Sequence, residues 1–183
     1  MRVLVISNFY PPYYLGGYEL ACQEMVEGLK ARGHQIRVLT SVYGIGSPQI
    51  SGEVYRWLKI GYGPISGNRI KNIFKIIKKE IIDWFLFIRL LSFFKPDLIY
   101  VWNLKWISTS LVFLAQRMKF PICYFVFDHW LAESAWETDS WYWLWRHKSK
   151  HFAVRAIKMP LRHFGQMSGL IPSDELDLRH VQF

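Results

Sequence analysis

The sequence lacks the features that identify secreted and membrane-spanning proteins. Its 183 residues include only two cysteines, Cys22 and Cys123, too few for a disulfide framework, so we expect two buried thiols in a reducing compartment. The N-terminus lacks the long apolar region and cleavage site of a signal peptide. The longest apolar stretch, residues 81–94, is shorter than the ~20 residues needed to span a bilayer. These absences predict a cytoplasmic protein without a transmembrane helix.

Acidic residues are also scarce. The chain has 14 Asp and Glu against 23 Lys and Arg, which gives a formal net charge of +9. This excess favours an anionic partner, such as a phosphorylated ligand, a nucleic acid or an acidic membrane surface. The basic residues form no groove-reading motif, so we expect no nucleic-acid partner.

The sequence does contain a regular alternation of short apolar runs and longer helical patterns. Hydrophobic residues make up 51% of the chain, enough for one globular domain with a sizeable core. The expected strands are 2–7, 35–40, 53–58, 98–102 and 121–127. The expected helices are one that ends at 32, one long helix or two consecutive ones over 68–94, and one over 105–118. This order predicts an α/β fold with a doubly wound, mainly parallel Rossmann-like sheet and helices on both faces.

Apolar positions at helical spacing predict which side of the first helix faces the sheet. They are Leu20, Ala21, Met25 and Leu29. Gly33 follows a basic last turn at a position that favours left-handed backbone, which predicts where this helix ends.

Residues 8–17 join the first strand to the first helix, where open α/β sheets bind ligands. Gly16 and Gly17 would let amides at the helix N-terminus approach a phosphate or a sugar hydroxyl. An equally good interpretation is a turn that needs positive φ. The patterns G-x-G-x-x-G and G-x-x-x-x-G-K-[ST] are both missing, which argues against a dinucleotide enzyme and a P-loop NTPase.

Polar residues after the fifth expected strand are a second candidate site. Asp128 and His129 lie where they could contact substrate hydroxyls or exchange a proton; the alternative is a capping Asp beside an exposed His. His147 and His151 have the i, i+4 spacing of metal ligands. Because no third ligand accompanies them, a solvated basic helix face is the better interpretation.

Two segments combine basic and apolar residues. The helix over 68–94 is basic at its start and apolar later, which fits peripheral binding to anionic lipid and fits equally a solvated charged face on a core helix. The aromatic cluster within 136–145 is expected to pack internally, with membrane contact as the second interpretation.

Four stretches of the sequence carry a family resemblance. They are RVLVISNFYPPYYLGGYE, LKARGHQIRVLTS, PDLIYVWN and FPICYFVFDHWL. In this order they resemble the N-terminal half of the sugar-nucleotide-dependent, retaining glycosyltransferases of family 4 (group 1), which have the GT-B fold. The resemblance covers residues 1–135.

Individual positions follow the family pattern unevenly. Asn103 is retained in the third stretch, but Trp102 stands where His is frequent. In the fourth stretch Asp128 matches, His129 fills a variable aromatic position and Phe127 replaces a frequent His.

The resemblance implies the acceptor-binding domain of an enzyme that moves a sugar from a nucleotide-diphosphate sugar to a sugar or lipid-linked acceptor. It implies no cofactor in this chain and no metal. The acceptor- or ligand-binding residues are then Gly16, Gly17, Asn103, Asp128 and His129, with Asp128 as the candidate for catalysis.

The resemblance also places the donor site in a second, C-terminal domain. We expect residues 1–183 to form a single acceptor-side domain that is inactive alone, with the nucleotide-sugar-binding domain absent. Exposed apolar surface would then favour self-association, and the charge would favour the inner face of the membrane. The alternative is a non-catalytic membrane-surface or protein-interaction module on the same fold, which Trp102 and Phe127 favour.

Overall fold

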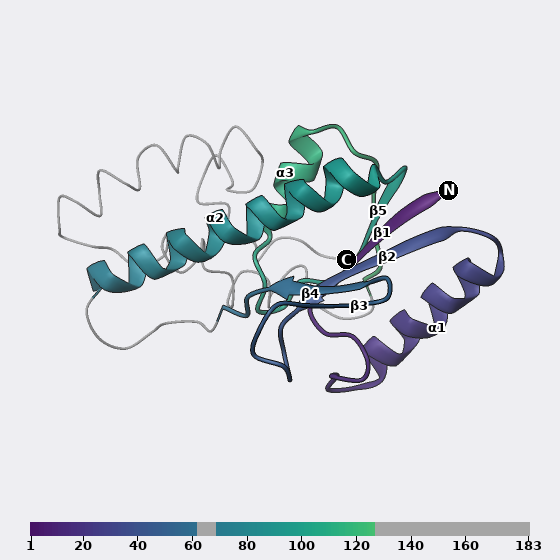
Figure 1. Ribbon diagram of the computed structural model, residues 1–183, viewed down its shortest axis with the longest axis horizontal. Coiled ribbons are helices and arrows are strands. Elements are labelled where there is room, and N and C mark those ends of the chain that lie inside the picture. The colour runs from purple at the N-terminus through teal and green to yellow at the C-terminus, as the bar shows by residue number, and fades with distance from the viewer. Residues whose placement is uncertain (62–68, 127–183) are drawn as a thin grey trace, which may run out of the picture. The chain divides into compact units, whose positions relative to one another are not determined.

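The computed structural model describes residues 1–61 and 69–126, which belong to one compact unit, Met1–Trp143. Figure 1 shows its elements, coloured along the chain. In chain order they are β1 (Arg2–Ser7), α1 (Gly17–Ala31), β2 (Gln35–Ser41), β3 (Gln49–Ser51), β4 (Val54–Leu58), α2 (Arg69–Phe94), β5 (Leu98–Asn103), α3 (Ser110–Arg117) and β6 (Ile122–Tyr124). The expected extent of the domain beyond these residues stays a prediction.

The strands form one six-stranded sheet in the order β3-β4-β2-β1-β5-β6. Every neighbouring pair is parallel except β3 and β4, which are antiparallel. β1 lies between β2 and β5, and its residues from Val3 to Ile6 are at most 4% exposed. A central strand covered on both faces explains why β1 is apolar without alternation. The predicted mainly parallel α/β fold is confirmed.

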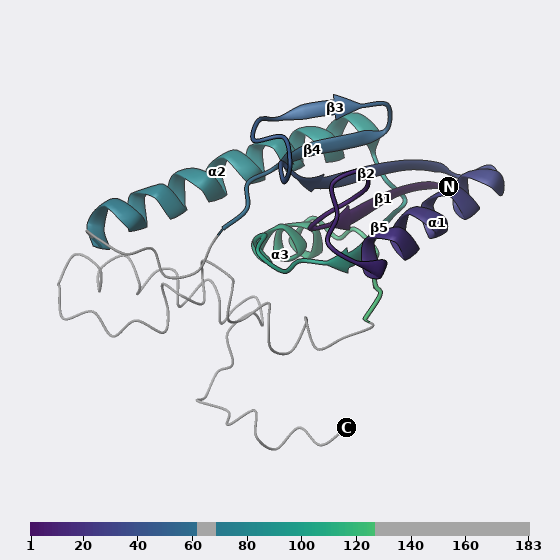
Figure 2. The ribbon, with the colours of Figure 1, turned by 90° about the horizontal axis from the view of Figure 1, so that it is seen from below.

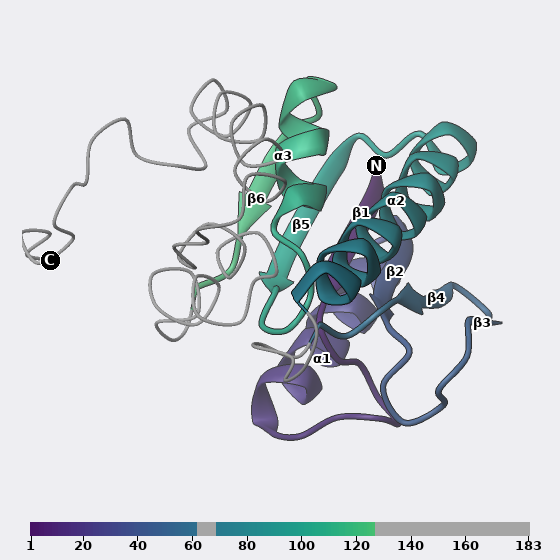
Figure 3. The ribbon, with the colours of Figure 1, turned by 90° about the vertical axis from the view of Figure 1, so that its left-hand side faces the viewer.

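Helices cover both faces of the sheet. Side chains alternate along each strand, so Val3 and Val5 pack with Val26 of α1, whereas Leu4 and Ile6 pack with α2 and α3. Figure 3 shows α2 in front of the strands and α1 behind them. The loops at the strand ends therefore join a sheet that is covered by helices on both faces.

The predicted inner face of α1 is right for Met25 and Leu29, which are partly buried and pack against the core, and wrong for Leu20 and Ala21. Leu20 is 39% exposed and Ala21 is exposed, whereas Glu19, Cys22 and Val26 are buried. Glu19 folds back onto the helix N-terminus, where its carboxylate accepts from the N–H of Gly16, and it begins the buried i, i+3, i+7 stripe. A pattern of apolar residues could not predict that the acidic Glu19 would be buried.

The two thiols also differ from expectation. Cys22 is buried, and burial together with Glu19 raises the pKa of its thiol. Cys123 is exposed; it lies in β6, the short strand at the edge of the sheet. The prediction of two buried thiols is therefore right for Cys22 and wrong for Cys123.

Other differences are local. β3 lies between the expected strands 35–40 and 53–58, where no strand is predicted, and β6 ends three residues before the expected end at 127. α3 begins at Ser110, later than predicted, because Asn103 starts a turn and Trp106 adopts a positive φ of 68°. Within the described ranges no helix has the length and apolarity to cross a membrane.

Candidate functional site

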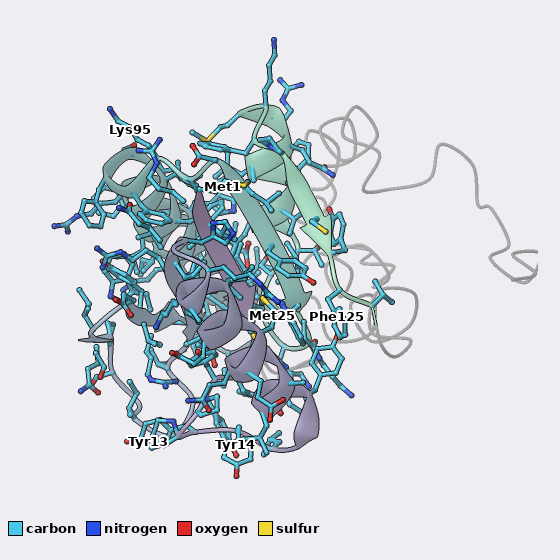
Figure 4. The ribbon with its side chains drawn as sticks, turned by 90° about the vertical axis from the view of Figure 1, so that its right-hand side faces the viewer. Met1, Tyr13, Tyr14, Met25, Lys95 and Phe125 are labelled. Atoms are coloured by element: carbon cyan, nitrogen blue, oxygen red, sulfur yellow. The ribbon has the colours of Figure 1, made fainter. Side chains whose placement is uncertain are left out.

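The candidate site is the carboxyl-terminal edge of the sheet, here called the ligand edge. Parallel strands end there together, at Ser7, Ser41, Leu58 and Asn103. α1 begins at the same edge after the loop over 8–16. Figure 4 shows Tyr13 and Tyr14 at this end, with Met1 and Lys95 at the opposite end. Open α/β sheets bind ligands at this edge.

Asn8 joins three strand ends at the ligand edge. Its backbone N–H donates to the carbonyl of Asn103 at 2.8 Å. Its carbonyl accepts from Thr40 Oγ1 at 3.2 Å and from Ser41 Oγ at 2.5 Å. Asn8 is 2% exposed, so these contacts lie in the interior. The first residue of the loop is thereby fixed to β2 and β5.

Arg56 fixes the middle of the same loop. Its Nη1 donates to the carbonyl of Tyr10 at 3.0 Å and its Nη2 donates to the carbonyl of Pro11 at 2.5 Å. The guanidinium also lies 5.2 Å from the ring centre of Tyr13. Burial lowers the pKa of Arg56. A Cβ at Gly44, which has a φ of 81°, would collide with the Tyr13 ring, so the loop is held from two sides.

The predicted glycine pair lies at the N-terminus of α1, and both residues are exposed. Gly16 is extended, with a φ of −162°, and neither glycine has a positive φ, so the turn interpretation is wrong. A Cβ on Gly17 would meet nothing within 4 Å. Open space, rather than backbone strain, distinguishes this position.

Glu19 changes the electrostatics of this helix end. Its Oε2 accepts from the N–H of Gly16 at 2.9 Å, and the side chain is buried. A helix N-terminus normally favours anions, but here a carboxylate already occupies part of that field. A neutral hydroxyl therefore fits this end of α1 better than a doubly charged phosphate.

Trp102, which stands at a frequent His position, is 3% exposed and packs among aromatic rings. It stacks on Phe125 at 4.1 Å between ring centres and meets Tyr18 edge-on at 5.7 Å. The Tyr18 hydroxyl lies 2.8 Å from the carbonyls of both Trp102 and Phe125. These contacts fix the start of α1 to the ends of β5 and β6, and they leave no proton-transfer group at Trp102.

Asn103 lies at the ligand edge, but its side chain serves the local turn. Its Oδ1 accepts from the N–H of Lys105 at 2.8 Å, and the residue is buried. The structure therefore brings Asn103, Gly16 and Gly17 to one edge of the sheet. Their role in ligand binding stays a prediction.

Half-buried aromatic side chains complete the ligand edge. Phe9 contacts Tyr43 at 4.5 Å and Trp106 at 5.5 Å between ring centres. The Trp106 carbonyl accepts from the N–H of Gly61 at 2.7 Å, and Lys105 Nζ lies 5.2 Å from the Trp106 ring centre. Tyr43 and Trp106 are partly exposed and offer apolar ring faces of the kind that pack against a sugar.

A buried ionic cluster ties α2 to the ligand edge. Lys79 Nζ lies 3.0 Å from Asp83 Oδ2 and 3.3 Å from Glu80 Oε1. Asp83 accepts from the N–H of Lys59 at 3.2 Å, and Glu80 accepts from Ser110 Oγ at 2.7 Å. We call these five residues the α2 brace. It joins α2 to the segment that follows β4 and to the first residue of α3.

Two acids share one ammonium in the brace. Burial opposes the charge of Lys79, but Glu80 and Asp83 outweigh it and raise the pKa of Lys79. Burial raises the pKa of Asp83, although Lys79 opposes this.

The remaining candidates lie outside the described residues. These are Asp128, His129 and Phe127, together with His147, His151 and the aromatic cluster at 136–145. Among residues 1–61 and 69–126, no group of three His, Cys, Asp or Glu side chains is placed to hold a metal ion.

Sequence reasoning missed the residues that hold the site together. Asn8, Glu19 and Arg56 bind backbone groups rather than a ligand. A signal was present at Arg56, a charged residue inside the expected apolar strand 53–58. Such a residue must find a partner when it is buried.

A comparison with protein families identifies the fold family. The profile described as the glycosyl transferase 4-like domain matches residues 16–157, a range that begins at the first of the two ligand-edge glycines. No curated protein matches the chain.

Proposed function

The chain belongs to the glycosyl transferase 4-like domain family, and from that premise we propose that it is the acceptor-binding half of a nucleotide-sugar-dependent glycosyltransferase. The family gives a role in glycosyl transfer. The observation that carries the finer proposal is the ligand edge itself. There Asn8 and Arg56 fix the loop over 8–16, which leads to Gly16 and Gly17 and lies beside partly exposed aromatic rings.

The electrostatics of the edge favour an acceptor over a nucleotide diphosphate. β2 ends in Thr40 and Ser41, and both hydroxyls bond to the carbonyl of Asn8. No acid stands there to bind a ribose. At the start of α1 the carboxylate of Glu19 would repel a pyrophosphate. A sugar supplies neutral hydroxyls and an apolar ring face, which suit the exposed glycines and Trp106.

The chemistry of transfer needs a group that removes the acceptor proton. Trp102 does not supply it, because an indole N–H is not a base at neutral pH. We propose Asp128 as the candidate in this half of the enzyme, with His129 in acceptor binding. The donor site and the remaining catalytic groups belong to a second domain, and transfer needs no metal.

The proposal predicts that sugars bind this chain without being transferred. Saturation-transfer NMR with the methyl glycosides of glucose, mannose, galactose and N-acetylglucosamine should detect binding. Gly17→Asp should weaken that binding by about tenfold, because it adds bulk and charge where a hydroxyl would bond. Ala21→Asp, on an exposed position of the same helix, is the matched control and should leave binding unchanged.

Activity provides the second test. The 183-residue chain, incubated with UDP-glucose or GDP-mannose and these glycosides, should form no disaccharide. Transfer at the rate of an ordinary glycosyltransferase would contradict a separate donor domain.

A non-catalytic membrane-surface or protein-interaction module is the second candidate function. The observation that favours it is Trp102, buried where an imidazole is frequent. Such a module would bind its partner but none of the glycosides, so the same NMR experiment separates the two candidates.

A further inference from the structure

The outer face of α2 carries large apolar side chains in contact with solvent. Phe74 is 66% exposed, Phe85 65%, Ile81 58% and Ile88 39%. At 3.6 residues per turn, these four positions fall within about 60° of the helix circumference. They form a continuous stripe along the helix. The core-facing side, with Phe87, Leu90, Leu91 and Phe94, is a separate set.

The exposed charges of α2 all have one sign. Lys71, Lys75, Lys78 and Arg89 are exposed and lie along one flank of the apolar stripe. The helix contains two acids, Glu80 and Asp83, which are 2% and 1% exposed because they belong to the α2 brace. The outer face therefore combines apolar groups with cations and presents no carboxylate of its own helix.

The length of α2 places this face beside the ligand edge. A helix of 26 residues is about 39 Å long, whereas the six residues of β5 span about 20 Å. α2 ends at Phe94, just before β5 begins, so its first half extends past the carboxyl-terminal end of the strands. Figures 1 and 2 both show this extension.

The charge pattern selects an anionic occupant. A second copy of the chain would bring lysines against lysines across a symmetric interface, which opposes pairing. Anionic lipid satisfies both parts of the face, since acyl chains accept apolar groups and phosphates accept cations. A solvated face on a core helix, the other sequence interpretation, would not expose two phenylalanines so fully.

We propose that the outer face of α2, comprising Phe74, Lys75, Lys78, Ile81, Phe85, Ile88 and Arg89, docks the protein on an anionic lipid bilayer. The apolar stripe enters the boundary between headgroups and acyl chains, and the cations contact lipid phosphates. Docking does not require sugar transfer. One consequence rests on the proposed function. If the ligand edge binds a sugar acceptor, docking beside a bilayer means that this acceptor is a lipid-linked sugar.

The test is co-sedimentation of the full chain with two kinds of vesicle. One contains phosphatidylcholine alone, and the other also contains phosphatidylglycerol. We expect binding to the anionic vesicles only, and we expect added salt to weaken it. Lys75→Gln with Lys78→Gln should lower partitioning about 25-fold, about fivefold for each charge removed. Phe74→Ser with Phe85→Ser should lower it at least about tenfold.

A matched control uses the opposite face of the sheet. Phe74→Ser with Lys78→Gln removes one exposed apolar group and one charge from α2. Leu20→Ser with Arg32→Gln removes the same from α1, where both residues are exposed. We expect the α2 pair to lose vesicle binding and the α1 pair to keep it.

Three outcomes would overturn the proposal. One is equal binding to both vesicle types, and another is equal loss with both matched pairs. The third is a concentration-dependent dimer, seen by sedimentation without lipid, that Phe85→Ser abolishes, which would make the face an interface between copies. Binding of glycosides at the ligand edge would be unaffected by any of them, so failure here leaves the proposed function standing.

Discussion

α1 and α2 cover opposite faces of one sheet. They differ in where their charged side chains lie. α1 spans 15 residues, about the length of the strands it covers, and its Lys30 forms exposed ion pairs with Glu27 and Glu53. α2 spans 26 residues, buries its two acids and exposes its phenylalanines. The extra length of α2 thus does more than cover the core. It carries the α2 brace on its inner side and exposed apolar and basic side chains on its outer side.

The largest effect should come from removing the cation of the α2 brace. Lys79→Met leaves Glu80 and Asp83 buried without their shared ammonium, which should lower the free energy of unfolding by about 3 kcal/mol. Urea denaturation followed by circular dichroism measures the loss. Lys78→Met, one residue away and exposed, is the control and should change stability by less than about 0.5 kcal/mol. Similar losses of stability in the two variants would mean that Lys79 contributes no more to folding than an exposed lysine.

The next effect concerns the α1 side of the ligand edge. Arg56→Met removes two hydrogen bonds to loop carbonyls, which should lower stability by about 2 kcal/mol. Hydrogen exchange should also quicken in residues 9–15. Arg32→Met, on an exposed arginine, serves as the control. Unchanged exchange in the loop would show that Arg56 does not hold it.

A smaller effect should appear as a pH dependence. Because burial raises the folded-state pKa of Asp83, the folded protein keeps a proton that the unfolded chain releases. The contribution of Asp83 to stability is then complete below the ordinary Asp pKa and is lost as pH rises through the raised value. Asp83→Asn cannot titrate and should therefore remove this part of the pH dependence. Parallel pH profiles of the two proteins in urea would contradict a raised pKa.

The smallest effect should come from the outer face of α2. Phe74→Ser should change the free energy of unfolding by less than about 0.5 kcal/mol, as should Leu20→Ser on α1. Thermal unfolding in the absence of lipid measures both. A large loss for Phe74→Ser alone would place that side chain in the core and remove it from the proposed docking surface.

The sequence predicts a helix or strand well when its apolar pattern directly reflects how it is buried. β1 is apolar throughout because it is covered on both faces, and α2 was placed within one residue at its start and correctly at its end. Periodicity placed Met25 and Leu29 on the inner face of α1, but it could not place Glu19 there, because the buried carboxylate depends on its bond from the N–H of Gly16. The same limit applies to the site. Sequence reasoning correctly placed Gly16, Gly17 and Asn103 at the carboxyl-terminal edge of the sheet. It missed Asn8 and Arg56, which act through contacts distant in sequence that no local pattern reveals.

The most direct test of the acceptor-side assignment is to map where sugars bind. Amide shifts of the isotope-labelled chain would be followed during titration with the four methyl glycosides and, separately, with UDP-glucose and GDP-mannose. We expect a glycoside to change the amide NMR shifts of Gly16, Gly17 and Lys105, and we expect the nucleotide sugars to leave these shifts unchanged. The assignment would be contradicted if no glycoside shifted these amides, or if a nucleotide sugar did.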